Sequence, residues 1–309
     1  MTQERTFMVT AATTSLGQHV VRRLAERGRV VTVRSSREPA PPAGEPESCV
    51  ADLTHTDDVR RVVGGLAAQM NVDTIVHLGS SGMHAEQPGA SHATSTRLLL
   101  DAAERTASVR SFVLRSTAEI YRARSDDPVI VDERHPLDFS TQPTPRQRDW
   151  LEADVTASQR MANASLRIAI LRLSEVLAPD IDSDLLDYLR LPVLLRPMGF
   201  DPMINLLSIG DAAQAVALAA ESTARGIFNV GGADTLPLSE LMHRLKSASW
   251  AIPGAFIDSM YALSKHKRGH SAALRALLHY GRVLDGRAAM EAFGYRPTHP
   301  VAWERMRAR

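Results

Sequence analysis

Residues 7–17 (Phe-Met-Val-Thr-Ala-Ala-Thr-Thr-Ser-Leu-Gly) constrain the fold of this 309-residue chain more than any other stretch. An apolar run leads into a turn of small residues, and a helical pattern opens at Gly17. Strand, tight turn and helix in this order leave free backbone N–H groups at a helix N-terminus, where a phosphate binds. We expect six residues to form such a phosphate cradle: Thr10, Ala11, Thr14, Ser15, Leu16 and Gly17. The alternative is a turn that merely connects a strand to a helix.

Short apolar runs alternate with amphipathic helical patterns along the first 171 residues. The expected strands are residues 7–9, 30–33, 48–51, 73–78, 112–114 and 168–171, and the later helices are 94–107 and 150–163, after a long loop over 122–148. This alternation predicts a Rossmann-type α/β fold, a doubly wound parallel sheet with right-handed crossovers. Ligands of such sheets bind at the carboxyl ends of the strands, so functional residues should follow the strands.

The chain divides into two expected units. Residues 1–173 and 206–232 should form the dinucleotide-binding domain, and residues 174–205 and 233–309 a smaller C-terminal substrate-binding region. Within the latter, residues 185–200 are rich in large apolar side chains, which suits a large, flat, apolar ligand. Core packing explains this stretch equally well.

Composition excludes several classes of function. With 36 basic and 35 acidic residues the net charge is +1, and the one short basic run, 265–268, is too small to hold a nucleic-acid backbone. A single cysteine, Cys49, excludes an internal disulfide framework and indicates a cytoplasmic protein. No apolar stretch approaches bilayer length, so no membrane partner is expected. The eleven histidines lack metal-ligand spacing, so we expect no metal.

Several strand ends resemble the extended short-chain dehydrogenase/reductase family of nucleotide-sugar epimerases and dehydratases. The matching segments are residues 10–17 (Thr-Gly-Gly-x-Gly-x-x-Gly in that family, with Ala11 and Thr14 in place of the first two glycines), 51–53, 75–80, 116–121 (Ser-Thr-x-Glu-Val-Tyr), 226–232 (Tyr-Asn-Val-Gly-Gly) and 285–297. They occur in the family's order from residue 7 to residue 297.

The resemblance implies a nicotinamide dinucleotide cofactor. Asp52 would bind the adenine amine with Leu53 against the ring, although Asp52 as a simple helix cap is the alternative. Leu78, Gly79 and Ser80 would line the cofactor cleft. After the second strand, the residues Arg34, Ser35, Ser36 and Arg37 stand where an NAD enzyme carries an acid. Guanidinium and hydroxyl groups there favour the 2′-phosphate of NADPH, with NADH tolerated, unless this is only an exposed basic turn.

The resemblance also indicates a depleted catalytic set. The family uses a Ser/Thr, a Tyr and a Lys four residues after the Tyr, and these positions fall on Thr117, Trp150 and Asp154. Tryptophan has no acidic hydroxyl, and an aspartate would repel a phenolate. The candidate catalytic residues are then Thr117, Ser95, Tyr121 and His92. For each of them a packing role or a bond to the backbone is the alternative.

Reduction of a ketone best tolerates the loss of a protein acid, because orientation contributes effective molarities up to about 10⁵–10⁸ M against roughly 10²–10⁴-fold for a positioned acid. A few family members with a depleted site act on aromatic polyketides. We therefore expect an NADPH-dependent ketoreductase for an angucyclinone-like aromatic substrate in antibiotic biosynthesis, with a substrate phenol as proton donor. The alternatives are a non-catalytic NADP(H)-binding regulator and a nucleotide-sugar epimerase. The chain should be a monomer or a homodimer.

Overall fold

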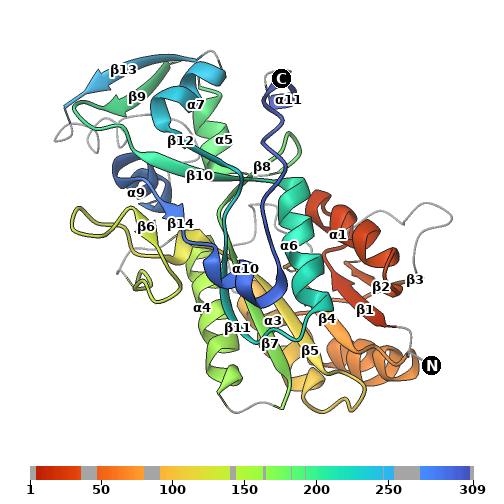
Figure 1. Cartoon of the computed structure of the whole chain (residues 1–309). Coiled ribbons are helices and arrows are strands. Elements are labelled where there is room, and N and C mark those ends of the chain that lie inside the picture. The colour runs from red at the N-terminus through yellow and green to blue at the C-terminus, as the bar shows by residue number, and fades with distance from the viewer. Residues whose placement is uncertain are drawn as a thin grey trace.

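The computed structural model describes residues 5–35, 47–79, 91–139, 144–162, 165–181, 183–191, 193–245, 247–253 and 272–306. Its centre is a seven-stranded parallel sheet in the order β11-β7-β5-β4-β1-β2-β3 (Figure 1). The strands are β1 (Thr6–Thr10), β2 (Arg29–Arg34), β3 (Glu47–Val50), β4 (Thr74–His77), β5 (Ser111–Thr117), β7 (Arg167–Leu173) and β11 (Gly226–Val230). The predicted Rossmann-type α/β fold is confirmed.

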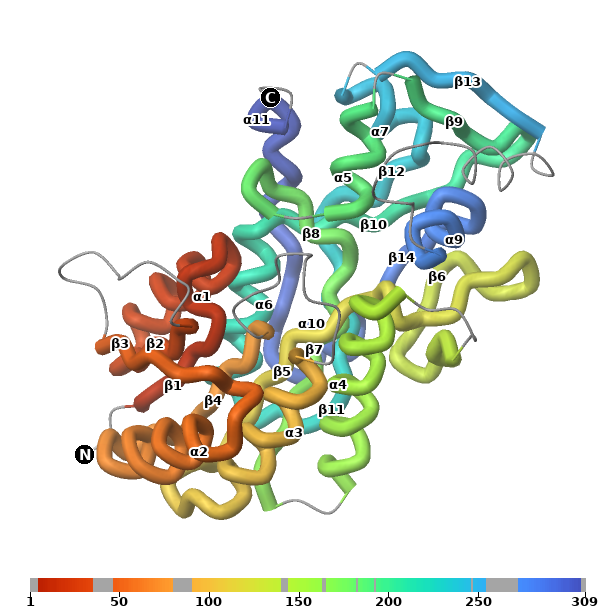
Figure 2. Tube along the Cα trace, turned by 180° about the vertical axis from the view of Figure 1, so that it is seen from behind, coloured from red at the N-terminus to blue at the C-terminus, as the bar shows by residue number. Residues whose placement is uncertain are grey.

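Helices cover both faces of this sheet. On one face lie α1 (Ser15–Ala25) and α6 (Ile209–Glu221); on the other lie α2 (Thr56–Val59), which continues as the π-helix η1 (Arg60–Ala67), then α3 (Ser91–Ala103) and α4 (Pro145–Met161). Figure 2 shows the second set from behind. Side chains alternate along β1: Phe7 and Val9 join the core under α1 and α6, whereas Met8 joins the core under α3. The two sets of helices therefore bury their apolar stripes against opposite faces of the sheet.

Two helices begin earlier than expected. Helix α3 spans Ser91–Ala103 instead of 94–107, and α4 begins at Pro145 instead of Trp150. The Thr144 hydroxyl accepts a hydrogen bond from the Gln147 N–H, and Pro145 occupies the first helical turn, where its missing donor costs nothing. Polar first turns hide such starts from a search for apolar periodicity.

A second region sits above the carboxyl ends of the main strands (Figure 1). It contains the three-stranded sheet of β8 (Glu175–Leu177), β10 (Met203–Ser208) and β12 (Asp234–Pro237), and the pair β9 (Val193–Pro197) and β13 (Ala248–Ile252). The remaining elements are η2 (Ala118–Ile120), β6 (Ile130–Val131), α5 (Asp184–Leu189), α7 (Leu238–Arg244), α9 (Ala272–Tyr280), β14 (Val283–Leu284), α10 (Arg287–Phe293) and α11 (Trp303–Met306).

The apolar stretch at 185–200 largely forms the core of this second region. Leu185, Leu186, Tyr188, Leu189 and Leu194 are buried together with residues of α7 and α9. Core packing, the second of the two explanations given above, therefore accounts for them. The basic run at 265–268 lies outside the described residues. Within the described part, no helix is both long and apolar enough to span a bilayer.

Candidate active site

The turn after β1 has the shape that a phosphate cradle needs. The Thr14 hydroxyl donates to the Ala11 carbonyl (2.7 Å) and accepts from the Gly17 N–H (3.1 Å), which caps α1. Ala11 has φ of 51°, a left-handed conformation that costs an alanine about 1 kcal/mol and a glycine almost nothing. The turn thus keeps its backbone path although an alanine has replaced the family's first glycine.

Gly17 cannot be replaced by a residue with a side chain unless this turn changes shape. A Cβ there would lie 2.2 Å from the Ala11 carbonyl oxygen and 2.8 Å from Ala12 Cα. This close approach leaves the N–H groups of Ser15 and Leu16 at the open end of an 11-residue helix. The Ser15 hydroxyl donates to Asp180. An anion would therefore be bound by the backbone N–H groups of the turn and not by this hydroxyl. The residues present therefore fit a pyrophosphate.

Thr10, Leu78 and Gly79 meet at the carboxyl ends of β1 and β4. The fully buried Thr10 hydroxyl donates to the Gly79 carbonyl (3.1 Å), accepts from the Leu78 N–H (3.2 Å) and contacts His77 Nδ1 (2.8 Å). The hydroxyl therefore fixes the two strand ends relative to each other. Because the hydroxyl is engaged in these contacts, only the backbone of Thr10 could contact a cofactor.

The adenosine side of the predicted cofactor site is described in part. Arg34 ends β2 and Ser35 follows it, while Ser36, Arg37 and Ser80 lie outside the described residues. Asp52 follows β3, and its exposed carboxylate accepts from the Thr54 N–H (2.9 Å) and hydroxyl (2.6 Å). These hydrogen bonds lower the pKa of Asp52. Leu53 is buried beneath it in the core.

A small pocket with a cavity volume of about 30 Å³, partly open to solvent, lies at the carboxyl ends of β5 and β7. Its walls include Thr117, Glu119, Arg146, Trp150 and Glu175. None of the described residues that line it is a tyrosine or a lysine. The pocket is thus at the place where the fold predicts the chemistry, and its lining is mostly polar or charged.

Trp150 and Asp154 lie on the face of α4 that meets β5. The Trp150 ring is buried, lies 4.1 Å from the His92 ring and has the Arg115 guanidinium 4.9 Å from its centre. Asp154 is fully buried and receives two hydrogen bonds from Arg172, at 2.6 and 3.0 Å, and one from Ser116 at 2.6 Å. Burial alone would lower the pKa of Arg172, but its bonds to Asp154 outweigh burial and raise it. This ion pair joins α4 to β7.

Tyr121 lies behind this ion pair. Its hydroxyl donates to Asn229 Oδ1 (2.7 Å) and accepts from Arg172 (3.0 Å), and its side chain is 1% exposed. Burial raises the pKa of Tyr121 to about 12. Thr117, in contrast, reaches the pocket, and its hydroxyl oxygen accepts from the Glu119 N–H (3.2 Å) at the start of η2.

His92 and Ser95 point into the protein. Ser95 is fully buried; its hydroxyl donates to the His92 carbonyl (3.0 Å) and contacts His77 Nε2 (3.1 Å). The two histidine rings stack 4.9 Å apart. Burial lowers the pKa of His77 to about 3 and moves the pKa of His92 well below its ordinary value, with His77 and Arg115 adding to the effect on His92. Both rings are neutral and support the Trp150 wall from behind.

The charged residues of the pocket were missing from the predicted site. Glu119 pairs with Arg146 (3.2 Å). Arg282, 6% exposed, is not among the lining residues and donates to the Ala118 carbonyl (2.6 Å). Burial, with Glu119 adding to it, raises the pKa of Glu175 to about 7. Glu175 stands two residues after the last residue of β7, so the rule that functional residues follow strands could have found it. Arg282 had no such signal.

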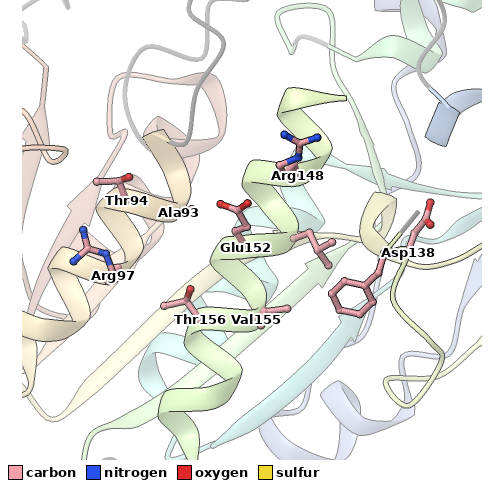
Figure 3. Close-up of a pocket in the computed structure, with 10 residues that line it drawn as sticks. Ala93, Thr94, Arg97, Asp138, Arg148, Glu152, Val155 and Thr156 are labelled. Atoms are coloured by element: carbon pink, nitrogen blue, oxygen red, sulfur yellow. The ribbon is translucent and has the colours of Figure 1, made fainter. Parts of the chain in front are cut away.

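A second hollow lies between α3 and α4, away from the strand ends. Figure 3 shows Thr94 and Arg97 of α3 across from Arg148 and Glu152 of α4. It opens on the outer surface of the helix layer and touches neither Thr117 nor the cradle. We therefore place the candidate active site in the strand-end pocket.

Comparisons with known proteins bear on the family and the fold. The model of the NAD dependent epimerase/dehydratase family matches residues 7–231. The uncharacterized protein Rv0501 of Mycobacterium tuberculosis is 30% identical over 310 residues, covering 94% of this chain and 79% of that protein.

Two solved structures share the fold. The crystal structure of gox2253 has 19% identity and a TM-score of 0.77, covering 99% of this chain and 96% of that chain. The UDP-glucose 4-epimerase of Thermus thermophilus in complex with NAD also has 19% identity, a TM-score of 0.68, and coverage of 98% and 96%.

Proposed function

The chain belongs to the NAD-dependent epimerase/dehydratase family, and we propose that within this family it is an NADP(H)-dependent reductase of a carbonyl compound. The observation that carries the proposal is the strand-end pocket beside the dinucleotide cradle. There the described lining contains four hydroxyls, two carboxyls and two guanidinium groups but no tyrosine or lysine. A bound reduced nicotinamide supplies a hydride at such a place. The pocket residues have only to hold the carbonyl and provide one proton.

NADPH is the proposed form of the cofactor. The cradle at Ser15 and Leu16 suits the pyrophosphate of either form, and the solved epimerase relative contains NAD. The difference lies after β2, where the chain has Arg34 and Ser35 and no acid. A guanidinium group can form two charge-assisted hydrogen bonds with a phosphate. It forms no such bidentate pair with a neutral 2′-hydroxyl, so Arg34 should favour NADPH.

The pocket favours a polar substrate. Arg146, Glu119 and Glu175 line it, so a ketone with neighbouring hydroxyl or carbonyl groups would find partners there. The apolar stretch that suggested a flat aromatic ligand is mostly buried core. An aromatic polyketide remains in the proposal as one arm of the experiment, because its phenols can also form hydrogen bonds.

Epimerisation of a nucleotide sugar is the second candidate. It requires a proton and a hydride to be returned in order, and the spacing Tyr-x-x-x-Lys that serves it in this family occurs once in the chain, at Tyr261 and Lys265. Both residues lie outside the described part. They give the alternative a specific pair to test.

The experiment incubates the purified protein with NADPH or NADH and follows cofactor oxidation with phenanthrenequinone, an anthraquinone-type ketone and dihydroxyacetone. We expect oxidation of NADPH with at least one ketone. A parallel assay follows conversion of UDP-glucose to UDP-galactose with NAD. Epimerisation that requires Tyr261 and Lys265 would establish the second candidate, and binding of NADPH in calorimetry without any turnover would leave a non-catalytic binder.

A further inference from the structure

Glu175 occupies a joint between the two parts of the molecule. The main-sheet strand β7 ends at Leu173, the Ser174 N–H donates to the Val230 carbonyl (3.0 Å), and β8 of the smaller sheet begins at Glu175 itself. Glu175 pairs in register with Leu206 of β10. Its backbone is therefore fixed by both sheets, and its side chain lines the strand-end pocket.

Thr117 lies on the neighbouring strand end. Thr117 of β5 pairs in register with Leu173, two residues before Glu175, and both side chains line the same pocket. A carbonyl oxygen between them would meet a hydroxyl on one side and a carboxyl on the other. This is the arrangement that a reduction needs, since the developing oxyanion is stabilised by one group and protonated by another.

The charges around Glu175 allow it to hold a proton. Four charged groups surround it: Glu119 of η2, Arg146 of α4, Asp184 of α5 and Arg282, which lies just before β14. Arg146 pairs with Glu119 (3.2 Å) and with Asp184 (3.7 Å), so its charge is shared between two other carboxylates.

No ion pair joins Glu175 itself to another residue of the described part. Burial and the nearby Glu119 together outweigh Arg282 and Arg146, and they raise the pKa of Glu175 to about 7. At neutral pH a large share of Glu175 is therefore a carboxylic acid. Glu119, in contrast, is engaged as the partner of a guanidinium.

Resting on the proposed function, we propose that Glu175 is the acid of this site and gives its proton to the carbonyl oxygen in place of the tyrosine used elsewhere in the family. The carbonyl carbon accepts the hydride, and the electron pair of the C=O double bond passes to the oxygen. The oxygen takes the proton of Glu175, which becomes a carboxylate. The carbonyl is reduced to an alcohol, the nicotinamide is oxidised, and Glu175 regains a proton from solvent at the pocket mouth.

The kinetic test measures single-turnover reduction of the ketone found active above, across pH, in the wild type and in two matched variants. Glu175→Gln removes the proton and keeps the shape; Glu104→Gln makes the same change on the protein surface, far from the pocket. We expect the wild-type rate to be constant at low pH and to fall about tenfold per pH unit above about 7, where the acid form is lost. E175Q should be slower by roughly 10²–10⁴-fold and lack this limb. E104Q should behave as wild type.

A second measurement does not depend on turnover. Infrared spectroscopy of the protein alone should show a carboxylic acid C=O band that titrates near neutral pH and is absent from E175Q. Absence of this band in the wild type overturns the proposal. So does unchanged reduction by E175Q, or the same loss produced by Glu119→Gln or Tyr261→Phe instead.

Failure of the proposed function has a different signature. In that case the wild type reduces no ketone, whether or not the infrared band of Glu175 is observed. Reduction that persists in E175Q overturns the role of Glu175 alone and leaves the reductase standing.

Discussion

Gly17 shows how a single residue fixes the backbone path of the turn between β1 and α1. Ala11 takes the left-handed conformation at a modest cost, but no rotamer change removes a Cβ 2.2 Å from a carbonyl oxygen. An alanine can adopt the backbone conformation at position 11, but no side chain fits at position 17. This difference determines which glycine of the turn remains.

Gly17→Ala should therefore weaken dinucleotide binding. The turn has to open to accommodate the methyl group, which displaces the N–H groups of Ser15 and Leu16, and we expect affinity for NADPH to fall at least about tenfold. Gly64→Ala is the matched control, because a Cβ there meets nothing within 4 Å. Calorimetric titration measures both variants. Equal affinities for G17A and G64A would contradict the cradle.

Arg34→Ala tests the form of the cofactor. A guanidinium bound to a 2′-phosphate contributes about 1.5–3 kcal/mol, so NADPH affinity should fall roughly tenfold to a hundredfold while NADH affinity stays within a factor of about two. Fluorescence titration with both nucleotides gives the ratio. Equal losses for the two would show that Arg34 serves only the end of β2.

At the scale of elements, the Asp154–Arg172 pair explains why α4 has a defined place against the sheet. The carboxylate of α4 and the guanidinium of β7 are both buried, at 0% and 3% exposure, and Ser116 of β5 completes the network. The structure assigns this network the role of holding α4 against the sheet. A lysine at position 154 would meet Arg172 with a like charge.

Arg172→Met should destabilise the protein by about 3–5 kcal/mol, because it leaves the Asp154 carboxylate buried without its partner. The double variant Arg172→Met/Asp154→Leu should recover most of this loss, since an apolar pair of similar volume removes the desolvation cost. Urea unfolding measures both. If the double variant is as unstable as the single one, the pair is not the unit that holds α4.

At the scale of the whole molecule, buried neutral histidines set the acid limit of stability. The pKa of His77 is lowered by burial to about 3, below the ordinary value of 6.5 that applies when the chain is unfolded. The unfolded chain then binds more protons, so His77 contributes stability at high pH that is lost as the pH falls below about 6.5. His92 acts in the same direction.

Replacing His77 should flatten this dependence. In His77→Asn the free energy of unfolding should fall less steeply between neutral pH and pH about 5, by up to about 1.4 kcal/mol per pH unit, even where the variant is less stable overall. His55→Asn serves as control because His55 is exposed. Denaturant titrations at several pH values give the slopes, and an unchanged slope in H77N would exclude the buried neutral ring.

The sequence by itself determined the sheet, because alternating apolar runs and helical stripes permit few other arrangements for strands such as 7–9 and 168–171. It also located the turn between β1 and α1 and the end of β5 with Thr117, since both follow directly from local strand and turn patterns. Helix starts with polar first turns, such as Pro145, left no periodic signal and were placed too late.

Only the tertiary structure decided which side chains share a pocket. Glu175, Glu119 and Arg146 come from three elements and line one pocket, and their charges, with that of the buried Arg282 nearby, matter because burial brings them together. The same contacts turned Tyr121, His92 and Ser95 inward, as hydrogen-bonded supports of the wall. Local pattern specifies where strands end, but desolvation and long-range pairing decide which group at those ends can hold a proton.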